Sequence, residues 1–141
     1  MKKRLFWLLA GVTLLFLLSV CKVSGRPLPE GMDKDTVLEE GREIVTMLND
    51  QDWQGVYDRL RPDAKEGASQ KDFEAAMLKN LEKAGAYEKE TEAMTTGQTL
   101  KTTGEEYGTA VFYCKHEKKS VLYRIAYSVE MELMGVEAQV Q

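Results

Sequence analysis

Residue types that commonly carry out catalysis are scarce in this chain of 141 residues. Its one histidine, His116, lies in the charged stretch KHEKK, and a thiol, Cys114, comes two residues earlier. No HExxH, CxxC, GxSxG or phosphate-loop pattern supplies the partners that a nucleophile, a base or a metal requires. We interpret His116 as a solvated residue of a hairpin and Cys114 as a small buried hydrophobe. We therefore expect no metal site and no cofactor.

A set of aromatic side chains offers a binding site instead. Aromatic rings with polar tips line many ligand pockets, but they also fill protein cores with their hydroxyl groups reaching the edge. Both interpretations stay open, a plain core and a core that includes the mouth of a pocket. The candidate residues, which come from one expected helix and two expected strands, are Trp53, Tyr57, Tyr113, Tyr123 and Tyr127.

The first 25 residues have the features of an export signal. The basic start MKKR precedes the apolar run LFWLLAGVTLLFLLSV, which is 16 residues long. A helix of that length spans about 24 Å, whereas a permanent membrane span must cross a hydrocarbon core of ~30 Å. The segment is therefore expected to be a signal peptide or lipoprotein leader.

Cys21 is the residue of this leader at which a lipid could be attached. The stretch LSVC resembles the lipobox of bacterial lipoproteins, in which the cysteine is acylated and becomes the new N-terminus. Val20 departs from the pattern, because a small residue is usual at that position. Cleavage after Gly25, where VSG resembles an ordinary signal-peptidase site, and an uncleaved anchor are the alternatives. We expect lipid attachment at Cys21, which would leave Cys114 without a disulfide partner.

The charge of the remaining chain argues against binding to nucleic acid. Of the 19 basic residues, Lys2, Lys3, Arg4 and Lys22 fall in the leader, which leaves 15 basic and 23 acidic residues and a net charge of −8 in the remainder. Phosphate contacts need clustered Lys and Arg. A membrane contact is therefore expected only through the N-terminus.

One domain of residues 35–141 is expected after a linker of residues 26–34, where the stretch RPLPEG disfavours regular structure. Three helices are predicted from apolar residues at helical spacing. Thr36 with Glu39 forms a capping-box pattern at the first helix, and Asp52 and Ser69 are the expected caps of the others. Gly85 is the expected terminator. The predicted helices span about 36–49, 53–60 and 69–84.

The second half of the domain is predicted to be an antiparallel meander. Residues 120–133, SVLYRIAYSVEMEL, alternate between apolar and polar types, so we predict one strand with a single buried face. Earlier strands are predicted at 87–99 and 107–117, joined by hairpins, and residues 136–140 could add a fourth strand. Gly135 is predicted to mark a turn or bulge. Three N-terminal helices packed on a curved meander make an α+β fold.

These elements carry a family resemblance. The stretches EIVTMLNDQDWQGVYDRL, FEAAMLKNLEKAGAYEKE and YRIAYSVEMELMGVEAQ resemble a bacterial domain-of-unknown-function family, numbered 3887. Members occur in exported and lipid-anchored proteins of Gram-positive bacteria. The resemblance implies a cystatin-like or nuclear-transport-factor-like cone fold, with a pocket between the first helix and the sheet. It implies no activity.

Two classes of function follow from this sequence. The preferred one is an exported or lipid-anchored, extracytoplasmic binding domain without enzymatic activity, whose partner is a protein or a small molecule. A homodimer formed through the sheet is a further hypothesis, with Arg124, Ser128, Glu130 and Glu132 on one polar face as its surface. The alternative is a small isomerase or hydrolase whose base is a carboxylate buried in the pocket.

Overall fold

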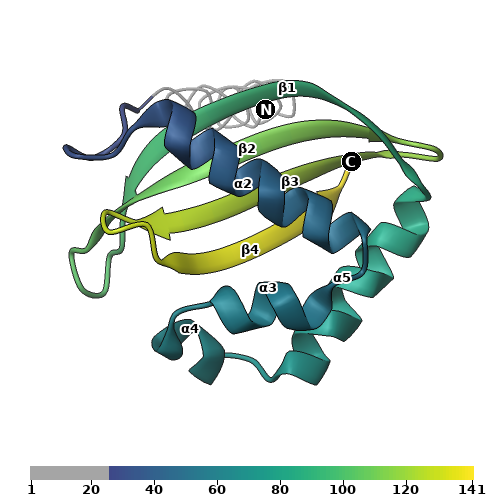
Figure 1. The fold of residues 1–141 in the computed structure, drawn as a ribbon, viewed down its shortest axis with the longest axis horizontal. Helices are drawn as coiled ribbons and strands as arrows, with labels where there is room; N and C mark the ends of the chain where they lie inside the picture. The colour runs from purple at the N-terminus through teal and green to yellow at the C-terminus, as the bar shows by residue number, and fades with distance from the viewer. Residues whose placement is uncertain (1–25) are drawn as a thin grey trace, which may run out of the picture.

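The computed structural model describes residues 26–141 and places helices against one antiparallel sheet (Figure 1). The strand order is β1-β2-β3-β4, so each strand pairs with its neighbour in the chain. The predicted α+β architecture, with helices preceding a meander, is confirmed, and it is compatible with a cystatin-like or nuclear-transport-factor-like fold. The helices are α2 (Lys34–Asn49), α3 (Trp53–Arg59), α4 (Pro62–Glu66) and α5 (Gln70–Ala84), and the strands are β1 (Tyr87–Thr99), β2 (Glu106–His116), β3 (Ser120–Ser128) and β4 (Leu133–Val140).

The helix boundaries follow from capping side chains. The Asp52 side chain accepts a hydrogen bond from the Gly55 N–H, and the Ser69 hydroxyl accepts one from the Asp72 N–H, as predicted. At α2 the capping residue is Asp33, which accepts from the Thr36 N–H at 2.9 Å, so an aspartate suits this helix start as expected, but the predicted capping box of Thr36 with Glu39 was wrong. The short helix α4 was not predicted either. It begins at Pro62, whose fixed φ suits the first position of a helix.

Helix α2 lies across one face of the sheet (Figure 1). Its apolar stripe is buried against Phe112 and neighbouring core residues. At Gly41, an added Cβ would lie 2.8 Å from the Ala110 Cβ and 2.9 Å from the Phe112 ring. Glycine is thus required here for the close approach of helix and sheet.

The strand predicted over residues 120–133 was wrong in its extent. Strand β3 ends at Ser128, and the chain reverses so that residues from Leu133 onward pair with β3 as β4. The Ser128 hydroxyl accepts a hydrogen bond from the Glu132 N–H, and Met131 has a φ of 65°. Gly135 lies within β4 beside a register shift, in agreement with the predicted bulge.

This reversal changes the surface expected for a homodimer. Arg124 lies on the sheet face opposite the core, where it pairs with Glu137. Ser128 is buried, and Glu130 and Glu132 lie in the connection between β3 and β4. The four residues therefore do not form one polar face of a single strand.

The segment before α2 lies against the domain. The Arg26 carbonyl accepts a hydrogen bond from the Gly97 N–H of β1 at 3.2 Å, and Leu28 and Met32 pack against the core. Within residues 26–141, no helix has the length and apolarity needed to cross a membrane. Cys21 and the rest of the expected leader lie outside the described residues.

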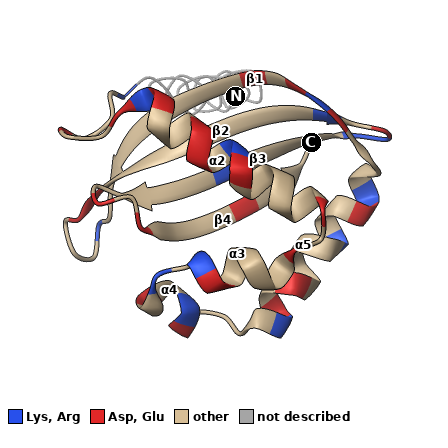
Figure 2. Cartoon of the chain, viewed as in Figure 1, with Lys and Arg blue, Asp and Glu red and all other residues tan. Residues whose placement is uncertain are grey.

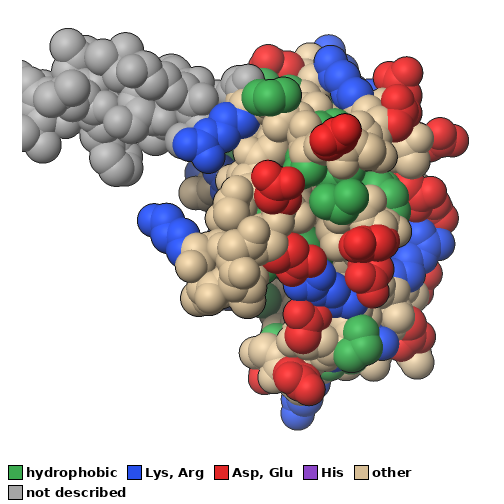
Figure 3. Space-filling view, turned by 90° about the vertical axis from the view of Figure 1, so that its left-hand side faces the viewer, with side chains coloured by type: hydrophobic (Ala, Val, Ile, Leu, Met, Phe, Trp, Pro, Cys, Tyr) green, Lys and Arg blue, Asp and Glu red, His purple; other side chains and the backbone are tan. Residues whose placement is uncertain are grey.

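Charged side chains of both signs are distributed over the surface. Figure 2 shows acidic residues along α2, and the face in Figure 3 carries both basic and acidic side chains. Several charges are paired between elements, including Arg42 with Glu90 at 2.9 Å. The Arg61 guanidinium binds both carboxylate oxygens of Glu105, each at 2.8 Å, and so joins the start of α4 to the β1–β2 loop.

Candidate ligand-binding cleft

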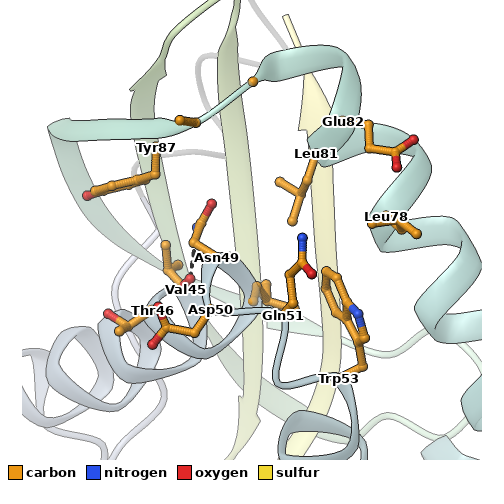
Figure 4. Close-up of a pocket in the computed structure, with 13 residues that line it drawn as sticks. Val45, Thr46, Asn49, Asp50, Gln51, Trp53, Leu78, Leu81, Glu82 and Tyr87 are labelled. Carbon is orange, nitrogen blue, oxygen red and sulfur yellow. Dashed lines mark hydrogen bonds between the residues drawn. The ribbon is translucent and has the colours of Figure 1, made fainter.

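A cleft of about 570 Å³ opens where α2 and α5 end and β1 begins (Figure 4). Its volume falls in the range typical of small-molecule sites. Figure 4 shows Asn49, Gln51 and Leu81 directed toward the same space, with Trp53 below them. The lining residues are Val45, Thr46, Leu48, Asn49, Asp50, Gln51, Trp53, Leu78, Leu81, Glu82, Gly85, Ala86 and Tyr87.

The lining combines an apolar wall with polar groups at the rim. Leu78 and Leu81 of α5 face the cleft from one side, and Trp53 of α3 closes it from below. Asp50 and Glu82 contribute exposed carboxylates, and neither forms an ion pair with any residue in 26–141. An apolar body and a few orienting polar groups could therefore be bound together here.

Gln51 enters this cleft from a constrained backbone position. The Asp52 N–H donates to the Met47 carbonyl and the Gln51 N–H to the Leu48 carbonyl, the pattern of a Schellman motif at the end of α2. This motif places Gln51 at a φ of 60°, a conformation that glycine adopts more easily. The chain thus keeps a glutamine side chain in the cleft at a position where glycine would be less strained.

A hydrogen-bonded chain runs from the cleft into the core. The Asn49 amide N–H donates to the Tyr123 hydroxyl oxygen at 3.1 Å, and this hydroxyl lies 2.9 Å from His116 Nε2. His116 Nδ1 lies 2.9 Å from the Gly85 carbonyl, which can only accept, so Nδ1 carries the proton. In the neutral ring Nε2 is then the acceptor, and the Tyr123 hydroxyl donates to it.

The structure therefore corrects the interpretation of His116 made from the sequence. Its side chain is 2% exposed, and it is not a solvated hairpin residue. The signal that could have found it is the period of β2, because Phe112, Cys114 and His116 alternate onto one face and all three are buried. Cys114 is buried as expected, and burial raises the pKa of its thiol to about 11.

The five aromatic residues proposed as pocket residues do not share one cavity. Trp53 lines the cleft, and Tyr123 lies beneath it, where burial raises the pKa of its hydroxyl. Tyr57 donates to the Ala68 carbonyl at 3.0 Å beside α4. Tyr127 lines a separate groove between α2 and β4, and Tyr113 lies on the opposite face of the sheet. The residues of the cleft that sequence reasoning missed are chiefly Asn49, Gln51 and Leu81.

A second groove, of about 740 Å³, lies on the sheet face opposite the core. Val111 and Leu122, which are both buried, line it together with Tyr113 and Arg124. Within residues 26–141, the helix contacts of β1, β2 and β3 are made on the other face.

Residues 26–141 contain no buried carboxylate and no cluster of metal ligands. Every Asp and Glu in residues 26–141 is at least partly exposed. Within that range, no three His, Cys, Asp or Glu side chains are grouped as metal ligands. The arrangement at the cleft can donate and accept hydrogen bonds, but it brings no buried carboxylate to a bound molecule.

These features describe a small α+β domain with an open cleft at the ends of two helices. Residues 41–136 match the family model described as "Protein of unknown function (DUF3887)", and the chain belongs to this family. The NMR structure of a protein from Ruminococcus gnavus ATCC 29149 is similar, with a TM-score of 0.66 and 27% sequence identity, over 79% of this chain and 96% of that chain. No curated protein matches.

Proposed function

We propose that this protein is an exported, membrane-tethered domain that binds a ligand in the cleft between α2, α5 and β1. The observation that carries the proposal is the combination of volume and lining, in which Leu78, Leu81 and Trp53 form an apolar wall beside the polar groups of Asn49 and Gln51. Binding without chemistry requires only such a wall and orienting groups. The left-handed backbone at Gln51 adds support, because strained residues concentrate at functional sites.

A screen of small molecules against the full chain tests this binding function. Ala86 is exposed at the cleft, so Ala86→Trp would fill the space without removing a core side chain. Ala75→Trp is the matched control, since Ala75 is exposed on α5 and does not line the cleft. Molecules that bind the wild type and Ala75→Trp, but not Ala86→Trp, support the proposal. Hits that bind all three proteins equally would contradict it.

Export and tethering rest on the N-terminal sequence. Two acyl chains at Cys21 would hold the protein at the outer surface of a cell membrane, since each buried CH₂ contributes ~0.8 kcal/mol. Cleavage after Gly25 would instead release a secreted domain. Mass spectrometry of the processed N-terminus distinguishes these fates. Cys21→Ser is expected to move the protein from the membrane to the soluble fraction, and an unchanged distribution would contradict lipid attachment.

The enzymatic alternative, an isomerase or hydrolase with a buried carboxylate, receives no support from the cleft. Asp50 and Glu82 are both exposed, so neither is the buried carboxylate that this alternative requires. We therefore favour a binding domain without catalytic activity.

Pairing of two copies through the sheet is a separate proposal. The surface it would use is the groove that contains Val111 and Leu122, in place of the four polar residues expected from sequence. Half-buried Met94 lies in this groove, so Met94→Glu would add a charge to each side of the interface. Light scattering is expected to show a wild-type dimer and a monomeric variant. A monomeric wild type at high concentration would contradict pairing.

A further inference from the structure

The cleft has an acidic lining without basic side chains. Asp50 lies on one side of the rim and Glu82 on the other, and the residues that line the cleft include no Lys, Arg or His. Neither carboxylate is neutralised by an ion pair within residues 26–141. The two unpaired carboxylates at the rim therefore favour a cation in the cleft over an anion.

Two helix ends reinforce this preference. Helix α2 ends at Asn49 and α5 at Ala84, so the C-termini of both helices meet at the cleft (Figure 4). The C-terminus of a helix carries a partial negative charge and stabilises a nearby cation. The last turn of α2 contains no basic residue, and Lys83 in the last turn of α5 does not line the cleft. The helix ends and the carboxylates therefore both favour the binding of a cation.

Asn49 presents a hydrogen-bond acceptor to the same space. One N–H of its amide donates to the Val45 carbonyl at 2.9 Å, and this carbonyl can only accept. The other N–H donates to the Tyr123 hydroxyl. Both donors are thereby used, and the amide oxygen points into the cleft (Figure 4). Its 3.5 Å separation from the Tyr123 hydroxyl is too long for a strong bond, so the oxygen is available to a ligand.

We infer that the ligand of this cleft carries an ammonium or guanidinium group on an apolar body. The cation would lie at the Asn49 amide oxygen, with Asp50 and Glu82 acting on it from opposite sides of the rim, and the apolar body would pack on Leu81 and Trp53. Ammonium and guanidinium groups are donors without acceptors, which matches a site whose free groups are acceptors. The inference deepens the proposed function, since it requires that the cleft binds a ligand at all.

Three probes with the same apolar body separate the ligand class from the binding function. They are 4-phenylbutylammonium, 4-phenylbutanol and 4-phenylbutyrate, which are cationic, neutral and anionic. The full chain with Trp7→Phe keeps Trp53 as its one tryptophan, so its fluorescence reports on the cleft. We expect the cation to bind about tenfold more tightly than the neutral probe, given two charges and two helix ends.

The results with these probes test the cationic ligand class and the binding function of the cleft separately. Equal or tighter binding of the neutral or anionic probe would overturn the cationic ligand but leave the binding function standing. No Trp53 response to any probe at millimolar concentration would contradict both claims. A cation preference that disappears in high salt, with the neutral probe unaffected, would support the electrostatic origin.

Substitutions that remove charge but keep shape provide the second measurement. Asp50→Asn and Glu82→Gln are each expected to weaken the cation two- to fivefold, roughly the effect of one exposed charge, and to leave the neutral probe unchanged. Glu66→Gln is the control, because Glu66 is an exposed carboxylate of α4 away from the cleft. An equal loss in Glu66→Gln would show that net charge alone is responsible and would overturn the assignment to this cleft.

Discussion

The Tyr123 hydroxyl lies 2.9 Å from His116 Nε2 in the core of the domain, and no more than 2% of either side chain is exposed. Three elements meet at this contact, because His116 ends β2, Tyr123 belongs to β3, and Asn49 at the end of α2 donates to the same hydroxyl. The contact therefore supports the floor of the cleft from beneath.

Removal of the Tyr123 hydroxyl should destabilise the protein. Tyr123→Phe would leave His116 Nε2 and one Asn49 N–H without partners, and an unsatisfied buried group costs about 1–3 kcal/mol. Urea unfolding measures this loss. Tyr127→Phe is the matched control, because the Tyr127 hydroxyl forms no hydrogen bond with residues 26–141 and lies on the same face of β3. Equal losses in the two variants would contradict the role assigned to the Tyr123 hydroxyl.

Gln51→Gly should separate stability from binding. A left-handed backbone costs a non-glycine residue about 1 kcal/mol, and glycine loses part of that gain through its greater freedom when unfolded. We expect a free energy of unfolding equal to or up to about 1 kcal/mol above wild type, with weaker ligand binding. Lys79→Gly, on an exposed position within α5, should instead lose about 1 kcal/mol. A destabilised Gln51→Gly would argue against the strain assigned to this residue.

Gly41→Ala tests the close approach of α2 to the sheet. Alanine favours helices over glycine by about 1 kcal/mol, but its Cβ would overlap with Ala110 and Phe112. Overpacking costs about 1–3 kcal/mol, so we expect a net loss in thermal unfolding experiments. Gly67→Ala, where the nearest atom is 3.5 Å away and φ is −74°, should be neutral or stabilising. A stabilised Gly41→Ala would contradict the packing described for α2.

The ion pair of Arg61 and Glu105 predicts acid sensitivity. The hydrogen bonds from Arg61 lower the pKa of the Glu105 carboxyl in the folded protein. This pair therefore stabilises fully above the unfolded pKa of about 4.3 and is lost as the pH falls through the lower folded value. Glu105→Gln should lower the melting temperature at pH 7, and the difference from wild type should shrink as the pH falls below 4. Glu106→Gln, without an ion pair in residues 26–141, should show no such difference.

Local signals predicted most of the helical half and the first hairpin. Asp52, Ser69 and Gly85 act on the backbone within a few residues of their own position, and each has its expected role in the structure. The close approach of α2 also has a local signal in the sequence, because Gly41 weakens a helix and its presence calls for a packing reason. Phe112, its partner across the fold, could not be identified, since no local pattern connects the two residues.

The errors arose where periodicity and turn chemistry disagree. Val129 and Met131 continue the apolar alternation of β3, and the turn after Ser128 contains no glycine or proline, so one long strand was expected. The structure instead turns with Met131 at a positive φ. The expectation that His116 is solvated was wrong because it relied on the neighbouring charged residues. The alternation of His116 with buried Cys114 along β2 indicates a buried side chain instead. In both cases the tertiary structure overrides the local sequence signal.

The cleft itself was only partly predictable. Trp53 was identified because a large aromatic residue near a helix start is easily seen, but Asn49 and Leu81 gain their roles from the meeting of α2 and α5. Which helix ends lie together at the edge of the sheet is a property of the tertiary structure, and the sequence alone does not show it. Aromatic residues were grouped by type, whereas the fold distributes them over three faces.

A crystal structure of the full chain, soaked with the tightest ligand from the screen, tests the central claim most directly. The account predicts ligand density between Asn49 and Trp53, with Gln51 turned toward it and the α2 and α5 backbones in place. Density in the groove of Val111 and Leu122, with the cleft filled by solvent alone, would contradict the assignment of ligand binding to this cleft.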